Sequence, residues 1–367
     1  MAYTTIDKPT DYFNTKLYTG TGATHNITGV GFQPDWSWLK CRSNLEGHEL
    51  YDSVRGVTKM LTSNGTSAES TQSTALTSFD SDGFTLGSDF EVNASGRTFV
   101  SWNWLAGGTA SSNTDGDITS TVSANTTAGF SIVKYTGSST NPSTVGHGLG
   151  TTPSMIIVKN TSTSGRDWVI WHKSLGGASS TDDLLVFTTS AKITSSGYWG
   201  SSAPSSTTFG VGNTNNNNAN GDNHIAYCFA EKKGFSKFGS YTGNGNNSDG
   251  TFVYTGFKPA WIMVKRTDTA GHYWPIMDSV RSPYNEISKQ LYASISDAEY
   301  DNAPNNADFL SNGFKLYHSA TPSPDNTNAS GGTYIYMAFA ENPFVTSTSI
   351  PCTARWFVLT QIVIMRL

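Results

Sequence analysis

One motif occurs three times along the chain, and this repetition constrains the fold more than any other feature of the sequence. A glycine is followed three residues later by a proline, and then by a short apolar run that ends in a lysine. The three copies are GFQPDWSWLK (residues 31–40), GTTPSMIIVK (150–159) and GFKPAWIMVK (256–265). Copies spaced by roughly 110 residues indicate a structural unit that is used three times.

The segments around the motif recur in the same order. Each copy follows a Tyr-Thr-Gly sequence and precedes a Gly-Phe or Phe-Gly segment, and each unit ends in an aromatic, apolar segment. The Tyr-Thr-Gly sequences begin at Tyr18, Tyr135 and Tyr241, the phenylalanines are Phe84, Phe209 and Phe314, and the closing segments are FVSWNWLAG from Phe99, HIAYCFAEK from His224 and YIYMAFAEN from Tyr334. The agreement covers most of the chain and predicts tandem repeats.

The motif is typical of strands and not of helices. The runs MIIVK and WIMVK are short, apolar on both faces and bounded by Gly and Pro upstream, which predicts strands buried in a sandwich core. We expect Gly31, Gly150 and Gly256 to adopt a positive φ that a Cβ would disfavour. The one stretch with helical character, residues 285–300, contains LYASIS, which aligns better as a strand with LLVFTT (184–189). The predicted fold is therefore all-β, with three tandem β-sandwich, jelly-roll-like repeats of about 105 residues.

Domain boundaries follow from these units. We place repeat 1 at residues 1–107, repeat 2 at 129–233, repeat 3 at 234–343 and a C-terminal tail at 344–367. Residues 108–128 are rich in Gly, Ser and Thr and are predicted to form a linker. No such segment separates repeats 2 and 3, so these two units are expected to pack closely.

The composition argues against several other classes of protein. Only 36% of the residues are hydrophobic, but 12% are aromatic and the net charge is −5, a combination that argues against disorder. The weakly acidic charge balance gives no electrostatic footprint for nucleic acid or an anionic membrane. The three cysteines form neither a metal-ligand pattern nor a disulfide framework. The start lacks the pattern of a signal peptide and no apolar run reaches the roughly 20 residues of a membrane helix, so we expect assembly in the cytoplasm.

Several segments resemble a repeated domain of unknown function found in marine bacteriophage virion proteins, often of the tail-fibre type. These segments are SANTTAGFSIVKYTG (123–137), IAYCFAEKKGFSKFGSYTGNG (225–245), FVYTGFKPAWIMVK (252–265) and, near the start, YFNTKLYTGTG (12–22), GFQPDW (31–36) and LYDSVRG (50–56). The resemblance extends to about Asn342. It implies a phage setting and a structural or adhesive role, and it supplies no catalytic residues.

Two copies of the sequence Asp-Ser-Val-Arg place an acid three residues before an arginine. The pairs are Asp52 with Arg55 and Asp278 with Arg281, whereas the second unit has His172 at the place of the aspartate. Such a pair is able to hold a sugar or carboxylate by charge-assisted hydrogen bonds. A local ion pair that supports a turn is the alternative interpretation.

Loop aromatics form a second group of candidate ligand contacts. Tyr198 and Trp199 precede the Asn-rich loop NTNNNNANGDNH (213–224), whose counterpart is SPDNTNASGG (323–332). Both loops are expected to be solvated turns, and exposed amides beside aromatics are a common way to present a sugar-contacting surface. Neither loop has the ligand spacing of a calcium-binding loop.

No sequence pattern predicts catalysis, a cofactor or a metal. His147 is interpreted as a turn residue because the third unit has Val253 at the same place. Glu231 and Glu341 end strands in separate units and are not expected to approach to the roughly 5–9 Å of a glycosidase pair. No nucleophile elbow, Walker loop or zinc-protease motif occurs. We therefore predict a protein that is not an enzyme.

The C-terminal segment ARWFVLTQIVIMRL is apolar on both faces of a hypothetical strand. It either returns to the core or adds a strand to a partner, and we favour a partner contact through Trp356, Phe357, Ile362 and Ile364.

The resulting expectation is a phage virion structural protein: a fibre, knob or capsid-surface component that contributes to host attachment. Its partners are then other virion proteins of the capsid or tail and, through the loops, host surface glycans. The alternatives are an adhesin with a defined sugar pocket and, less favoured, a polysaccharide depolymerase. Three units in one chain also suit either a pseudo-threefold monomer or a homotrimer.

Overall fold

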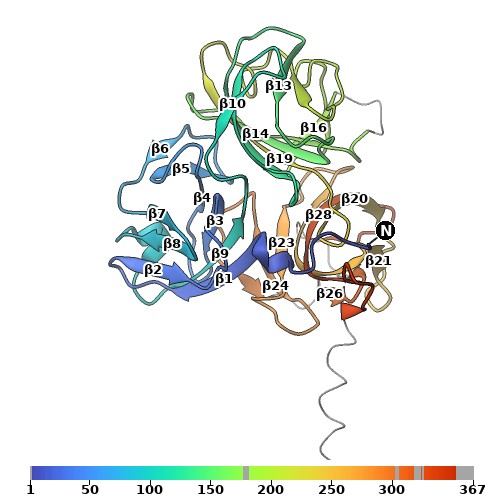
Figure 1. Cartoon of the computed structure of the whole chain (residues 1–367). Coiled ribbons are helices and arrows are strands. Elements are labelled where there is room, and N and C mark those ends of the chain that lie inside the picture. The colour runs from blue at the N-terminus through green and yellow to red at the C-terminus, as the bar shows by residue number, and fades with distance from the viewer. Residues whose placement is uncertain (1, 177–181, 302–305, 318–323, 325, 353–367) are drawn as a thin grey trace, which may run out of the picture.

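The computed structural model describes residues 2–176, 182–301, 306–317, 324 and 326–352. Over these residues the protein is all-β, with three large antiparallel sheets and three small ones. The helices there are the short 3-10 helix η1 (Pro9–Asp11) and the single turn α1 (Phe90–Asn93). Figure 1 shows three lobes around a common centre, formed by the blue, green and orange-red parts of the chain in turn.

The first lobe contains a six-stranded large sheet and a three-stranded small sheet. The large sheet has the order β1 (Phe13–Thr19), β9 (Thr98–Trp104), β3 (Trp36–Cys41), β4 (His48–Asp52), β5 (Lys59–Thr62) and β6 (Ser70–Thr71). The small sheet has the order β2 (His25–Thr28), β8 (Gly83–Leu86) and β7 (Leu76–Asp80).

The second lobe has an eight-stranded large sheet. Its order is β10 (Ser111–Asn113), β11 (Ser120–Asn125), β12 (Phe130–Thr136), β19 (Asn223–Phe229), β14 (Met155–Asn160), β15 (Val169–His172), β16 (Asp183–Val186) and β17 (Ile193–Thr194). The small sheet pairs β13 (Ser143–Gly146) with β18 (Thr208–Val211). Residues 108–128, expected to be a linker, differ from that expectation, because β10 and β11 extend the sheet beside β12. Their β-branched threonines and valine suit a strand edge as well as a linker.

The third lobe repeats the arrangement of the first. Its large sheet has the order β20 (Ser236–Thr242), β28 (Thr333–Pro343), β22 (Phe257–Arg266), β23 (Pro275–Asp278), β24 (Lys289–Tyr292) and β25 (Tyr300–Asp301). Its small sheet has the order β21 (Thr251–Tyr254), β27 (Gly313–Leu316) and β26 (Ala307–Leu310). The LYASIS segment therefore enters strand β24, and its counterpart LLVFTT enters β16, as predicted.

The motif strands are buried on both faces, as the sequence predicted. Every residue of β3 and of β14 is buried. In β14, successive side chains enter two different cores. Met155 and Ile157 lie in a core shared by all three lobes, and Ile156 and Val158 lie in the core of their own lobe. The turn glycines Gly31, Gly150 and Gly256 adopt φ values of 91°, 67° and 81°, also as predicted.

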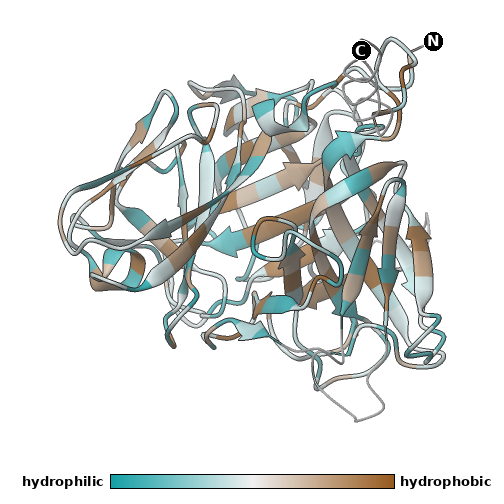
Figure 2. Ribbon diagram, turned by 90° about the horizontal axis from the view of Figure 1, so that it is seen from below, coloured by the Kyte–Doolittle hydropathy of each residue, from teal (hydrophilic) through white to brown (hydrophobic). Residues whose placement is uncertain are grey.

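The shared core is an aromatic cluster at the centre of the molecule. Strands β9, β19 and β28 each send three alternate side chains into it: Val100, Trp102 and Trp104; Ile225, Tyr227 and Phe229; and Ile335, Met337 and Phe339. Trp36 of the first lobe stacks on Tyr227 of the second with ring centroids 4.3 Å apart. In Figure 2 the brown, apolar residues lie mainly along the strands, whereas the outer loops are mostly teal or white.

Three backbone hydrogen bonds join the lobes in a closed ring. In each, the residue before the outermost strand of one large sheet donates to the residue after the motif strand of the next. The bonds run from Glu69 N to Thr161 O, from Lys192 N to Thr267 O and from Glu299 N to Arg42 O, with lengths of 2.9, 2.9 and 2.7 Å. Lobes 1 and 2, 2 and 3, and 3 and 1 are thus connected in the same way.

Candidate functional site

The two Asp/Arg pairs are buried ion pairs and not surface contacts. Asp52 Oδ1 accepts hydrogen bonds from the backbone N–H groups of Val54 and Arg55, and Asp52 Oδ2 lies 2.5 Å from Arg55 Nε. The Asp52 and Arg55 side chains are 0% and 2% exposed. Asp278 and Arg281 reproduce this geometry with both side chains fully buried. A sugar in solvent cannot reach either pair, so the interpretation as a turn-supporting ion pair describes them better.

A side chain from the neighbouring lobe completes each pair. Tyr227 of the second lobe donates its hydroxyl to Asp52 Oδ2 at 2.8 Å, and Trp102 of the first lobe donates Nε1–H to Asp278 Oδ2 at 3.0 Å. Trp102 and Tyr227 occupy corresponding positions, since they pair with Trp38 and Ile157 of the motif strands. Each pair is therefore an inter-lobe lock.

In the second lobe, a histidine makes the corresponding contact with the neighbouring lobe. His172 stands where the other lobes have the aspartate, and its Nε2 lies 3.3 Å from the carbonyl oxygen of Tyr336 in the third lobe. The third lobe has Met337 at the position of Trp102 and Tyr227. A methionine side chain is a poor hydrogen-bonding partner. The adjacent backbone carbonyl is the group that contacts the imidazole instead.

A second set of inter-lobe bonds comes from Trp168 and Trp274, which lie four residues before His172 and Asp278. Trp168 donates Nε1–H to the carbonyl of Thr62, and Trp274 donates to the carbonyl of Val186, at 2.8 and 2.9 Å. At the remaining interface the hydroxyl of Ser63 donates to the carbonyl of Ala293 at 2.6 Å. Together with Asp52, His172 and Asp278, these side chains hold the lobes together.

The structure corrects the interpretation of the loop aromatics. Trp199 is 2% exposed and packs in the core of the second lobe. Tyr198 is partly buried against the same core, and its hydroxyl lies 3.3 Å from Asn216 Nδ2. The segment runs beside the end of β18, since Gly212 N donates to Tyr198 O and Asn213 N donates to Gly197 O, and Trp199 packs with Phe209 and Val211. Trp199 is not available to an external ligand.

The Asn-rich loops are also not solvated turns at their centres. Asn93, Asn218 and Asn328 are fully buried at corresponding places in the three lobes. Asn218 Oδ1 accepts from Ser138 N, and its Nδ2 donates to the carbonyls of Thr140 and Gly212. The recurring sequence Asn-Ala-Ser/Asn-Gly at 93–96, 218–221 and 328–331 was the signal for this structural role, and we did not predict it.

The remaining titratable candidates have internal partners. His147 is buried, its Nδ1 accepts from Leu149 N and its Nε2 lies 3.3 Å from Ser205 O, so it is the turn residue that was expected. Glu231 forms ion pairs with Lys173 and Lys237, both at 2.6 Å, which lower its pKa despite partial burial. Glu341 pairs with Lys258 at 3.0 Å.

Three lysines that end the motif strands are buried. Lys40 donates to the carbonyls of Cys41 and of Ser296 in the third lobe, and Lys265 donates to the carbonyls of His272 and of Thr188 in the second. Lys159 donates to the carbonyl of Arg166 within its own lobe. Burial lowers the pKa of Lys265 to about 7 and the pKa values of Lys40 and Lys159 to about 8.

Because these lysines are buried, we expect the free energy of unfolding to rise with pH between about 7 and 9.5. In that window the unfolded chain, with a lysine pKa of about 10.4, binds more protons than the folded chain, so the free energy of unfolding increases with pH. We expect Lys265→Met to reduce this slope by up to about 1.4 kcal/mol per pH unit. Urea unfolding at several pH values measures it, with the exposed Lys8→Met as the control for loss of a lysine. An unchanged slope in Lys265→Met would contradict the assignment.

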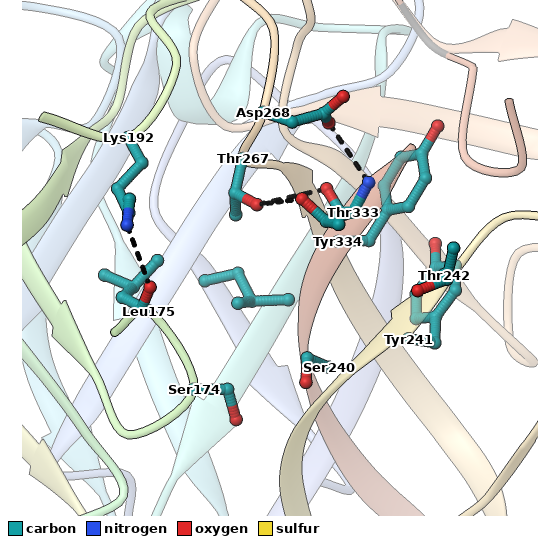
Figure 3. Close-up of a pocket in the computed structure, with 11 residues that line it drawn as sticks. Ser174, Leu175, Lys192, Ser240, Tyr241, Thr242, Thr267, Asp268, Thr333 and Tyr334 are labelled. Carbon is teal, nitrogen blue, oxygen red and sulfur yellow. Dashed lines mark hydrogen bonds between the residues drawn. The ribbon is translucent and has the colours of Figure 1, made fainter. Parts of the chain in front are cut away.

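A groove with polar and apolar walls lies between the second and third lobes. It has a volume of about 540 Å³ and is lined by hydroxyl groups, two tyrosine rings, one carboxylate and one ammonium group. The lining side chains are those of Ser174, Leu175, Lys192, Ser240, Tyr241, Thr242, Thr267, Asp268, Thr333, Tyr334 and Ile335 (Figure 3). Here Lys192 N donates to Thr267 O, and Tyr241 and Tyr334 stack with centroids 4.9 Å apart. Tyr334 is 1% exposed, so the surface offers mainly hydroxyl groups, Asp268 and Lys192, beside the partly exposed Tyr241.

One carboxylate of the groove, that of Asp268, is held in place by an ion pair with Arg266. Asp268 lies at the surface; desolvation acts to raise its pKa, but the hydrogen bonds that it accepts from Arg266 at 3.0 Å and from Thr333 N lower the pKa to about 2. Thr267 and Thr333 share a hydroxyl–hydroxyl contact of 2.8 Å beside it. The carboxylate is thus ionised at neutral pH and held in place.

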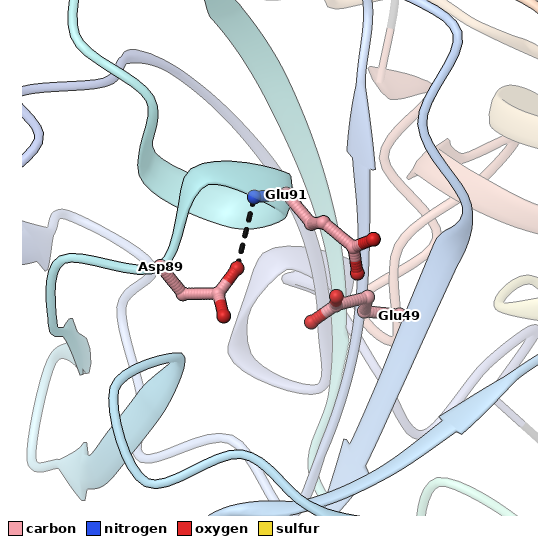
Figure 4. Close-up of side chains that lie close together, drawn as sticks. All are labelled: Glu49, Asp89 and Glu91. Carbon is pink, nitrogen blue, oxygen red and sulfur yellow. Dashed lines mark hydrogen bonds between the residues drawn. The ribbon is translucent and has the colours of Figure 1, made fainter.

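Among the described residues, one group has the geometry to hold a metal ion. Glu49, Asp89 and Glu91 of the first lobe each offer a carboxylate oxygen, and these oxygens lie within 4.8 Å of one another (Figure 4). The predicted partner contact at Trp356, Phe357, Ile362 and Ile364 lies outside the described residues. Within them, no helix is both long and apolar enough to cross a membrane.

The described part of the chain is thus an all-β protein built of several antiparallel sheets. The chain belongs to the family described as domain of unknown function (DUF7483), whose model matches residues 8–343. No curated protein and no solved structure matched the chain.

Proposed function

We propose that the chain is a pseudo-threefold monomer of three tandem β-sandwich repeats. The shared strand order of the large sheets, the ring of backbone bonds and the central aromatic core support this arrangement. Each lobe also has a separate core between its large and small sheets. A homotrimer is then not needed to produce threefold geometry.

The function we propose is that of a bacteriophage virion structural protein, a fibre, knob or capsid-surface component. The observation that carries this proposal is the ring of inter-lobe locks, in which Asp52, His172 and Asp278 serve assembly of the fold and not chemistry. The resemblance of the sequence to marine phage virion proteins supplies the setting. Partners would be other virion proteins of the capsid or tail.

Presence in the particle tests this proposal. Purified virions of the source phage are expected to contain the chain at a fixed, stoichiometric copy number by quantitative mass spectrometry, and virion density should contain a three-lobed unit. Particles that are complete and infectious without the chain would overturn the proposal.

The groove supports a contribution to host attachment through surface glycans. Its serine and threonine hydroxyls and the ionised Asp268 are suited to hydrogen-bonding a sugar. An adhesin with a defined sugar pocket is the second candidate function, favoured by the same groove.

A substitution that fills the groove tests this role. We expect Ser240→Trp, at an exposed lining position, to abolish saturable binding to host surface polysaccharide, and Asp268→Asn to weaken it by roughly tenfold, as for loss of a charged hydrogen bond. Ser248→Trp, in an exposed loop outside the groove, is the matched control and should bind as the wild type does. Calorimetry or a glycan array gives the affinity, and equal binding by all variants would exclude the groove.

A further inference from the structure

A cluster of three carboxylates in the first lobe, Glu49, Asp89 and Glu91, has no role in the function proposed above. Glu49 projects from strand β4, while Asp89 and Glu91 flank the start of helix α1, so two separate elements bring their carboxylates together. In Figure 4 the carboxylates of Glu49 and Glu91 point toward each other and that of Asp89 lies beside them. One Asp89 oxygen accepts from Glu91 N at 2.9 Å, which fixes the side chain.

Glu49 is the part of the cluster that points to a missing ligand. The residue is 1% exposed, Oε2 accepts a hydrogen bond from the hydroxyl of Tyr51 at 2.5 Å, and no N–H or hydroxyl donor among the described residues reaches Oε1. Burial and the adjacent carboxyl group of Glu91 raise the pKa of Glu49. A buried carboxylate without a partner is costly. Asp52 and Asp278, which are buried as deeply, each have an arginine.

Among the residues that the structure describes, no cation neutralises the cluster. Over the described part of the chain, none of the three carboxylates forms an ion pair with a lysine, arginine or histidine. Carboxylates held this close repel one another unless a proton or a bound cation lies between them. Asp89 and Glu91 are half-buried, so an ion from solvent is able to reach them.

The other lobes do not need acids at these places. Counting from the corresponding asparagines Asn93, Asn218 and Asn328, the positions of Asp89 and Glu91 are Thr214 and Asn216 in the second lobe and Pro324 and Asn326 in the third. The position of Glu49 is Val169 and Pro275, counted from the aligned His172 and Asp278. The fold therefore forms with neutral residues there, and three acids coincide in one lobe.

We propose that Glu49, Asp89 and Glu91 form a calcium-binding site. Ca²⁺ binds oxygen ligands at roughly 2.3–2.6 Å in a flexible geometry and readily takes carboxylates from separate elements. Mg²⁺ retains most of its waters and is usually held by one or two carboxylates, and the set contains no nitrogen or sulfur ligand that would select zinc or copper. The bound ion would join β4 to the α1 segment that carries the buried Asn93.

Terbium luminescence and thermal unfolding of the full chain test the site. Tb³⁺ as a probe for Ca²⁺ should show sensitised emission, because Tyr51 touches Glu49, and Ca²⁺ should displace it. Ca²⁺ should also raise the unfolding temperature progressively with its concentration, and EGTA should reverse the shift. We expect Glu91→Gln to lower Ca²⁺ affinity by at least roughly tenfold, since even changes outside the first ligand shell cost roughly 10–100-fold.

Glu91 is half-buried, so the Glu91→Gln variant is expected to remain folded. Unfolding in EGTA then distinguishes a bound Ca²⁺ ion from a proton that is shared between two of the carboxyl groups. In EGTA, Glu91→Gln should unfold at or above the wild-type temperature, because a repelling carboxylate is gone, whereas in Ca²⁺ the order should reverse. Glu341→Gln, which removes an acid outside the cluster, should keep the full Ca²⁺ response. A wild-type unfolding temperature that is the same in EGTA and millimolar Ca²⁺, or a response retained by Glu91→Gln, would overturn the site.

Discussion

Replacing Asp278 with alanine is expected to lower the free energy of unfolding by about 3–5 kcal/mol, the usual cost of breaking a buried ion pair. The substitution leaves the guanidinium of Arg281 buried without its main partner and removes the acceptor of Trp102 Nε1–H. Glu299 keeps its ion pair with Arg281 Nη1 at 3.3 Å, but Arg281 Nε loses its acceptor. Urea denaturation followed by tryptophan fluorescence measures the loss.

Two further variants show whether this loss reflects a lock between lobes. Trp102→Phe keeps an aromatic ring but removes the donor, so its effect and that of Asp278→Ala should not add in the double variant. Asp249→Ala removes an acid whose ion pair with Lys315 is at the surface, and it should leave stability unchanged. Additive losses, or an Asp278→Ala variant as stable as the wild type, would show that the contact does not couple the lobes.

Truncating Trp36 to alanine is expected to destabilise all three lobes together, by about 3–5 kcal/mol. The side chain is 1% exposed and contacts rings of two lobes, with Trp104 at 4.5 Å, Tyr227 at 4.3 Å and Phe130 at 5.8 Å between centroids. The cavity would open at the point where the three large sheets meet. Hydrogen exchange should therefore accelerate in the large strands of every lobe.

A substitution in one separate core is the control for this prediction. Phe84 is fully buried between the large and small sheets of the first lobe. Phe84→Ala should accelerate exchange chiefly in β2, β7 and β8, which pack on that core. If Trp36→Ala also affects only the first lobe, the central cluster does not couple the lobes.

The local features of the fold were predictable because they depend on short sequence patterns. Runs such as MIIVK specify a strand buried on both faces, and the glycine before each proline specifies a positive φ. The linker prediction at 108–128 differed from the structure because Ser- and Thr-rich segments suit an edge strand as well as an extended linker, and only a neighbouring strand such as β12 decides between them. Trp199 was placed at the surface because its polar neighbours dominate the sequence around it.

The candidate sites depended on information that the sequence does not contain. The groove is formed by residues from 174 to 335 on facing lobes, and the acid cluster joins residues 49 and 89–91 across two elements. No spacing in the chain relates these positions. The recurring Asn-Ala-Ser/Asn-Gly sequence was the one overlooked signal, and it marks a buried structural amide.

By itself, the sequence determined that this chain is all-β and that its motif strands are apolar on both faces, because alternation and turn chemistry act over a few neighbouring residues. Only the tertiary structure decided what the conspicuous polar residues do. Asp52 and Asp278 meet Tyr227 and Trp102 because the lobes pack around the shared core, and these partners lie 175 and 176 residues apart, beyond the reach of any local pattern.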